Sequence, residues 1–68
     1  MFQISAKNAT SGQLVYAWSN RRQGLMHTTA EVHDNPGDWR IVRVHGVSER
    51  GLITDVGVYP ANMTIVVY

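Results

Sequence analysis

The sequence contains no cysteine, one lysine and two prolines in 68 residues. Without cysteine, the chain forms no disulfide and offers no thiolate ligand to a metal. It has no apolar run long enough to cross a bilayer, and its first residues lack the basic and apolar pattern of a signal peptide. These absences favour a soluble cytoplasmic protein with no membrane association, held together by packing alone.

Charge of either sign is also scarce. Six basic and five acidic residues give a net charge of +1, which is too small to favour nucleic acids or anionic membranes by bulk electrostatics. The hydrophobic content of 44% is that of a folded protein, and the length allows a single small β domain over residues 1–68. So small a core is near the lower limit for independent folding, so we expect another chain to contribute to stability.

Turn-forming residues recur about every ten to twelve positions, which is the spacing of an all-β chain. Short connections between strands make neighbouring strands antiparallel. The sequence therefore predicts an all-β fold, a small antiparallel six-stranded meander or barrel. The six predicted strands are Phe2–Lys7, Leu14–Ser19, Leu25–His33, Trp39–Gly46, Leu52–Tyr59 and Met63–Tyr68.

The segment from Leu25 to His33 admits a second interpretation. Thr28 and Glu31 have the spacing of a helix capping box, and several apolar residues of the segment recur at helical spacing. Asn35 and Pro36 would end such a helix after about two turns. The alternative to the all-β fold is thus an α+β fold with one short helix near residues 25–34.

Several predicted strands are apolar on both faces. Val42 and Val44 lie on one face of their strand, whereas Trp39, Ile41 and Arg43 lie on the other. The last strand, Met63–Tyr68, alternates between two largely apolar faces and carries no charged side chain. Strands of this kind are buried on both sides, so we expect the last strand to pair with Phe2–Lys7 or with its counterpart in a second copy. A homo-oligomer would also cover the second face.

Catalytic and metal-binding signatures are weak. His27 and His45 would approach each other if their strands pair, but no spaced ligand motif accompanies them, so we predict no metal and no cofactor. The set His33, His45, Glu31, Arg40 and Arg43 contains the residue types of a small ribonuclease-like enzyme. No nucleophile elbow or phosphate-binding loop supports this remote alternative, so we expect a protein that is not an enzyme.

Aromatic residues near arginine are the most informative remaining feature, because both are enriched in the cores of protein interfaces. We predict a non-enzymatic macromolecular interaction module, a small accessory or inhibitor protein that binds another protein and self-associates. The alternative is a single-stranded nucleic-acid-binding domain, in which bases stack on Trp and Tyr beside Arg. In either case, the candidate contact residues are Trp18, Arg21, Arg22, Trp39, Arg40, Arg43 and Tyr59, unless the Trp and Tyr side chains belong to the core.

Overall fold

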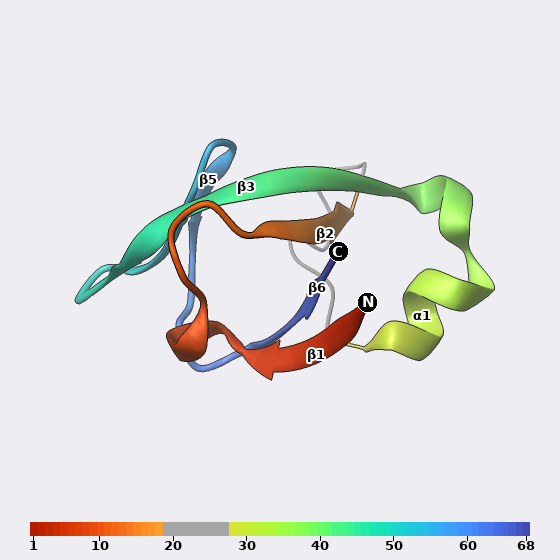
Figure 1. The fold of residues 1–68 in the computed structure, drawn as a ribbon, viewed down its shortest axis with the longest axis horizontal. Coiled ribbons are helices and arrows are strands. Elements are labelled where there is room, and N and C mark those ends of the chain that lie inside the picture. The colour runs from red at the N-terminus through yellow and green to blue at the C-terminus, as the bar shows by residue number, and fades with distance from the viewer. Residues whose placement is uncertain (19–27) are drawn as a thin grey trace.

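The structure, a computed structural model, describes residues 1–18 and 28–68. Six strands, one short α-helix and two 3₁₀ helices make up this part of the chain (Figure 1). Their order is β1 (Phe2–Ser5), η1 (Ala6–Asn8), β2 (Leu14–Trp18), α1 (Thr29–Asp34), η2 (Pro36–Asp38), β3 (Trp39–Ser48), β4 (Gly51–Thr54), β5 (Gly57–Tyr59) and β6 (Thr64–Val67). Among the described residues, no helix has the length and hydrophobicity needed to span a bilayer.

The strands form one six-stranded antiparallel sheet with the order β1-β6-β2-β3-β4-β5, which confirms the predicted all-β fold. Strands β2 to β5 follow one another as a meander. Strand β6 then returns to the middle of the sheet and lies between β1 and β2 (Figure 1). The predicted pairing of the last strand with the first is confirmed, with Phe2 opposite Val67 and Ile4 opposite Ile65.

The predicted strand over Leu25–His33 is wrong for its described residues, because α1 begins at Thr29. The side chain of Thr28 accepts a hydrogen bond from the backbone N–H of Glu31 (3.2 Å), which caps the helix as the alternative interpretation expected. The helix ends at Asp34, before Asn35 and Pro36. Residues 25–27 lie outside the described residues.

The predicted strand over Leu52–Tyr59 is two strands, β4 and β5, joined by a tight turn. The Thr54 hydroxyl donates to the carbonyl of Gly57 (2.8 Å) and accepts from the backbone N–H of Val56 (3.3 Å). Gly57 has a φ of 153°, a value that glycine reaches without strain. The predicted number of six strands is therefore right, although two of the six predicted segments are not. The segment that contains α1 is not a strand, and the segment Leu52–Tyr59 supplies two strands.

The main core fills one side of the sheet. Its residues come from η1 and the segment after it and from strands β2, β3, β4 and β6: Ala6, Ala9, Val15, Ala17, Val42, Val44, Leu52, Ile65 and Val67. Leu52 and Ile65 are fully buried here, and the half-buried side chains of Ile4, Tyr59 and Met63 pack against this cluster. These small and branched side chains allow the curled sheet to close tightly around a core with few large residues.

A second, smaller core lies on the opposite side of the same sheet. Val32 of α1 packs with the fully buried Val66 of β6, and Tyr16 and Trp39 lie against this pair. The Oε1 atom of Gln3 accepts a hydrogen bond from the backbone N–H of Thr29 (3.0 Å), which ties the helix to β1. The second apolar face is thus covered in part by the chain itself, where we expected another chain.

The exposed surface agrees with this self-contained arrangement. The accessible area is 4181 Å² for a chain of 7.6 kDa. A folded monomer of that mass is expected to expose about 4300 Å². The exposed area is therefore close to that expected of a folded monomer of this mass, and part of the second face remains open.

Candidate interaction surface

Strands β2 and β3 place a row of large side chains on the side of the sheet away from the main core. The register sets Leu14 opposite Arg43, Tyr16 opposite Ile41 and Trp18 opposite Trp39. Paired residues on neighbouring strands project to the same face of a sheet. We call this surface the aromatic face, and its members are Leu14, Tyr16, Trp18, Trp39, Ile41, Arg43 and Tyr68.

Tyr68 joins the aromatic face because β6 runs beside β2. Its backbone N–H donates to the carbonyl of Leu14 (2.8 Å), which fixes the residue next to β2. The rings of Tyr16 and Tyr68 lie 5.9 Å apart at an interplanar angle of 56°. This tilted contact is a favourable aromatic geometry, and it holds the exposed ring of Tyr68 against a half-buried partner.

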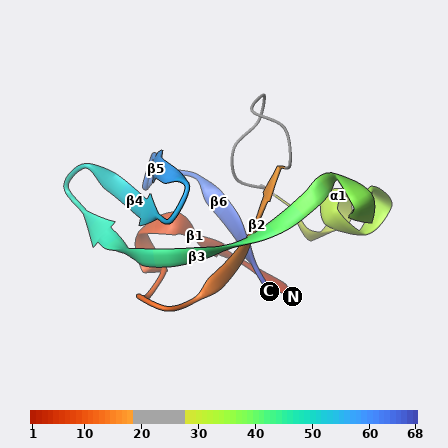
Figure 2. The ribbon, with the colours of Figure 1, turned by 90° about the horizontal axis from the view of Figure 1, so that it is seen from above.

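The aromatic face is closed at one end and open at the other. At the closed end, Val32 of α1 packs on Val66, and Tyr16 and Trp39 pack against these two residues. In the open part, 39% of Ile41 and 66% of Tyr68 is exposed to solvent. Figure 2 shows α1 at one end of β3, with the remainder of that strand extending away from it. The exposed part of the aromatic face is therefore apolar and aromatic, and it is bordered by Arg43.

The two tryptophans contact each other and form the closed end of the face. Their ring centroids are 4.2 Å apart and the rings are nearly perpendicular, at 76°. Both residues are half-buried, and both indole Nε1 atoms are buried without a hydrogen-bond partner among the described residues. Trp18 and Trp39, both predicted as contact residues, therefore pack against each other at this end of the aromatic face.

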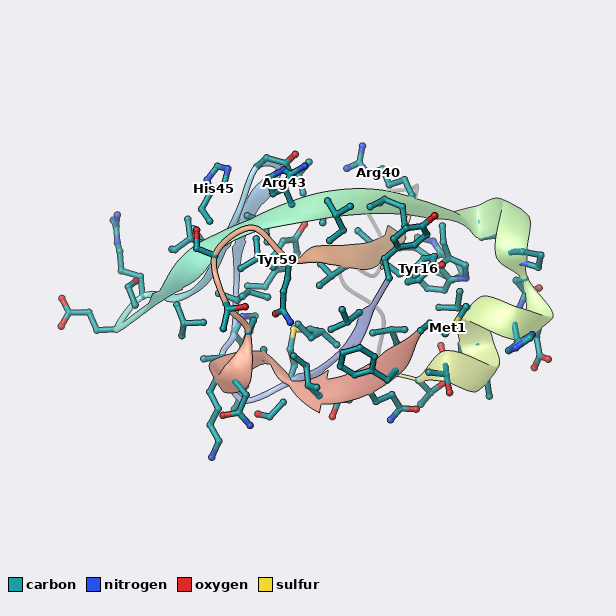
Figure 3. All side chains as sticks on the ribbon, viewed as in Figure 1. Met1, Tyr16, Arg40, Arg43, His45 and Tyr59 are labelled. Carbon is teal, nitrogen blue, oxygen red and sulfur yellow. The ribbon has the colours of Figure 1, made fainter. Side chains whose placement is uncertain are left out.

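Arg43 is held in place at the border of the open part. Its Nη1 atom donates to the carbonyl of Gly12 (3.2 Å), and its backbone N–H donates to Oδ1 of Asp55 (3.3 Å). His45 follows on the same strand, and both side chains are exposed. Figure 3 shows Arg43 and His45 projecting from β3 toward the same side in that view. Such an anchored guanidinium loses less freedom on binding a partner than a free one would.

The other predicted contact residues lie elsewhere. Arg21 and Arg22 fall outside the described residues. Arg40 lies opposite the buried Ala17 and is exposed, but alternation places its side chain on the other face of β3 from Ile41 and Arg43. Tyr59 belongs to β5 and packs half-buried against the main core, so it does not join the aromatic face.

The seven candidate contact residues did not include Tyr16, Ile41 or Tyr68, which the structure places on the aromatic face. Strand alternation was sufficient to place Ile41 beside Arg43 on one strand. The approach of Tyr68 to Tyr16, however, depends on β6 lying next to β2, which local sequence does not indicate. The largest exposed side chain of the face therefore became visible only in the fold.

The residue types for catalysis are not brought together. Glu31 and His33 lie on α1, whereas His45 is six residues past the start of β3, or roughly 20 Å along an extended strand. Within residues 1–18 and 28–68, no group of three or more His, Cys, Asp or Glu side chains is arranged to hold a metal ion. The possible approach of His27 to His45 concerns a residue outside this part of the chain, because His27 is not among the described residues.

Comparison with known proteins finds no relative: no family model, no curated protein and no solved structure matches this chain. The functional interpretation therefore rests on the chemistry and the exposure of the aromatic face.

Proposed function

We propose that this protein is a non-enzymatic interaction module, a small accessory or inhibitor protein that binds another protein through its aromatic face. The observation that carries the proposal is the exposure of Tyr68 and Ile41, at 66% and 39%, on the same face as the guanidinium of Arg43, which is bonded to the Gly12 carbonyl. The absence of cysteine favours the cytoplasm as its compartment.

Tyr and Arg are the residues that most often dominate the binding energy of protein interfaces, together with Trp. Here they lie on a sheet whose backbone is fixed by hydrogen bonds on both sides of β2, so the surface is organised before a partner arrives. A rigid aromatic surface loses little conformational entropy when it is covered. The aromatic face thus combines the chemistry and the rigidity expected of a binding surface.

Single-stranded nucleic acid is the alternative partner, and the observation that favours it is that the exposed ring of Tyr68 and the guanidinium of Arg43 lie on one face of the sheet, on either side of β2. A base could stack on the ring while the guanidinium contacts a phosphate. Asp55 lies beside Arg43, however, and the net charge of the chain is only +1. Because binding of a nucleic acid weakens steeply with salt, a salt titration distinguishes this partner from a protein.

Site-specific photo-cross-linking tests the proposal. A photoreactive amino acid at position 41 samples the centre of the aromatic face, and the same amino acid at the exposed position 7 on η1 serves as the control. We expect a discrete protein adduct from position 41 and none from position 7. A second substitution, Tyr68→Ser, should reduce the adduct because it removes the neighbouring exposed ring. Equal cross-linking from both positions, or none from either, would contradict the proposal.

A further inference from the structure

Charged residues border the aromatic face unequally at its two ends. Residues 28–38, which form α1 and η2, contain Glu31, Asp34 and Asp38 and no lysine or arginine. Strand β3 then carries Arg43 on the face of Ile41 and contains no acidic residue, whereas Arg40 lies on its other face. The side chains of Glu31, Asp34, Asp38 and Arg43 are exposed. The surface therefore changes from acidic to basic along β3.

The apolar centre of the aromatic face lies between these two borders. Ile41 is flanked by Asp38 three residues earlier and by Arg43 two residues later. Asp38 is the last residue of η2, directly before β3, and the four steps from Trp39 to Arg43 span roughly 13 Å at about 3.3 Å per residue. Helix α1 adds its own acidic residues on this side of the sheet, because Val32 packs on Val66 there. Figure 1 shows α1 at one end of the long strand β3, which fixes the direction of the charge gradient.

If a second copy of this surface is rotated by 180° and packed against the first, the acidic end of each copy meets the basic end of the other. We propose that the occupant of the aromatic face is a second copy of this chain, packed antiparallel about a two-fold axis near Ile41. This inference rests on the proposed function and names its partner. The axis places Ile41 and Tyr68 against the same surface of the other copy, and it places each Asp38 opposite the Arg43 of the other copy.

A stable dimer interface would cover a large share of the surface of so small a protein. A standard interface removes about 800 Å² from each partner, which would be roughly a fifth of the 4181 Å² exposed by this chain. The exposed apolar side chains of the aromatic face are too few to supply that area alone. The acidic and basic borders therefore have to lie within the interface, and the antiparallel arrangement is the one that pairs them.

Asp55 is the one acidic residue near the basic border, and its contacts are compatible with this arrangement. Its Oδ1 atom accepts from the backbone N–H of Arg43, and its own backbone N–H donates to the carbonyl of Arg43. The guanidinium of Arg43 instead donates to the carbonyl of Gly12 through one nitrogen. Its remaining N–H groups are available to a carboxylate of the second copy.

Charge reversal tests the antiparallel dimer. Sedimentation velocity over a range of protein concentrations should show a monomer–dimer equilibrium for the unmodified chain. Arg43→Glu and Asp38→Arg should each weaken the dimer about tenfold or more, because each change places like charges opposite one another at both symmetric contacts. An equimolar mixture of the two variants should restore the dimer, as should the chain that carries both changes.

The restoration also shows that the single variants remain folded. Arg50→Glu is the matched control, because Arg50 is an exposed arginine in the turn between β3 and β4, away from the aromatic face; it should leave the equilibrium unchanged. A monomer at all concentrations, or single variants whose mixture does not dimerise, would overturn the inference. The cross-linking at position 41 separates the two proposals: an adduct with a different protein would support the proposed function and overturn the second copy as the occupant.

Discussion

Trp18 and Trp39 lie directly opposite each other on β2 and β3, with their rings nearly perpendicular and their centroids 4.2 Å apart. This edge-to-face contact joins the end of β2 to the start of β3, where the chain comes out of η2. Trp39 also packs against Val32 and Val66 beneath α1. The pair therefore connects the helix to the sheet, which is a role in stability.

Trp39→Ala should lower the free energy of unfolding by about 2–4 kcal/mol, slightly less than the loss for a fully buried Trp, because the side chain is half-buried. Urea denaturation followed by circular dichroism measures the change. A double-mutant cycle with Trp18→Ala should give a coupling of about 0.5–1.5 kcal/mol for the ring contact. A variant as stable as the parent protein would instead assign Trp39 to partner binding.

Val66→Ala should destabilise the protein by about 1.5–3 kcal/mol, because Val66 is fully buried between the sheet and α1. Val58→Ala is the matched control: it removes the same methyl groups from β5, where 53% of the side chain is exposed. Its effect should stay within about 0.5 kcal/mol. Chemical denaturation of both variants makes the comparison, and similar losses would argue against the second core beneath α1.

Gly51→Ala should destabilise the protein by about 3 kcal/mol or more. Gly51 has a φ of 124°, which is unfavourable for alanine, and a Cβ atom at this position would overlap the backbone carbonyl oxygen of Tyr59 on β5. Gly46→Ala in the neighbouring strand β3 is the control, since a Cβ atom there meets no heavy atom within 4 Å. Thermal unfolding should separate the two variants clearly, and equal melting temperatures would contradict the close approach of β5 to Gly51.

Thr28→Ala should weaken α1, because it removes the N-cap acceptor for the backbone N–H of Glu31 and the donor to Glu31 Oε1. The expected loss is about 1 kcal/mol. Hydrogen exchange should show faster exchange of the α1 amides before any change in β3. Thr10→Ala, an exposed position outside any helix or strand, should change neither quantity. Unchanged exchange in α1 after Thr28→Ala would show that the cap does not hold the helix.

Local patterns in the sequence were sufficient to assign the side chains of β3 to its two faces, because successive side chains of a strand point to opposite faces. Both faces were expected to be buried, whereas the structure buries Val42 and Val44 and leaves Ile41 and Arg43 exposed. The capping spacing of Thr28 and Glu31 indicated the short helix, although the β-branched residues around it favoured a strand. There, two local signals of similar strength competed, and packing of Val32 on Val66 decided between them.

The aromatic face was less predictable than the strands that carry it. Arg43 was identified from its place beside aromatic residues, whereas Tyr16 and Tyr68 were not identified as contacts. Their rings meet only because β6 lies next to β2, with Val15 opposite Val67. Conversely, Tyr59 was predicted as a contact and packs on the main core, because the turn after Thr54 folds β5 back along β4.

The sequence by itself determined the all-β class and the alternation of side chains along the strands, because these depend on residues a few positions apart. The tertiary structure decided that β6 lies between β1 and β2 and that α1 covers Val66. It also decided that Tyr68 and Ile41 stay exposed on the same face as Arg43. These outcomes depend on residues that are distant in the chain, whose pairing is selected by the apolar area that the whole fold buries.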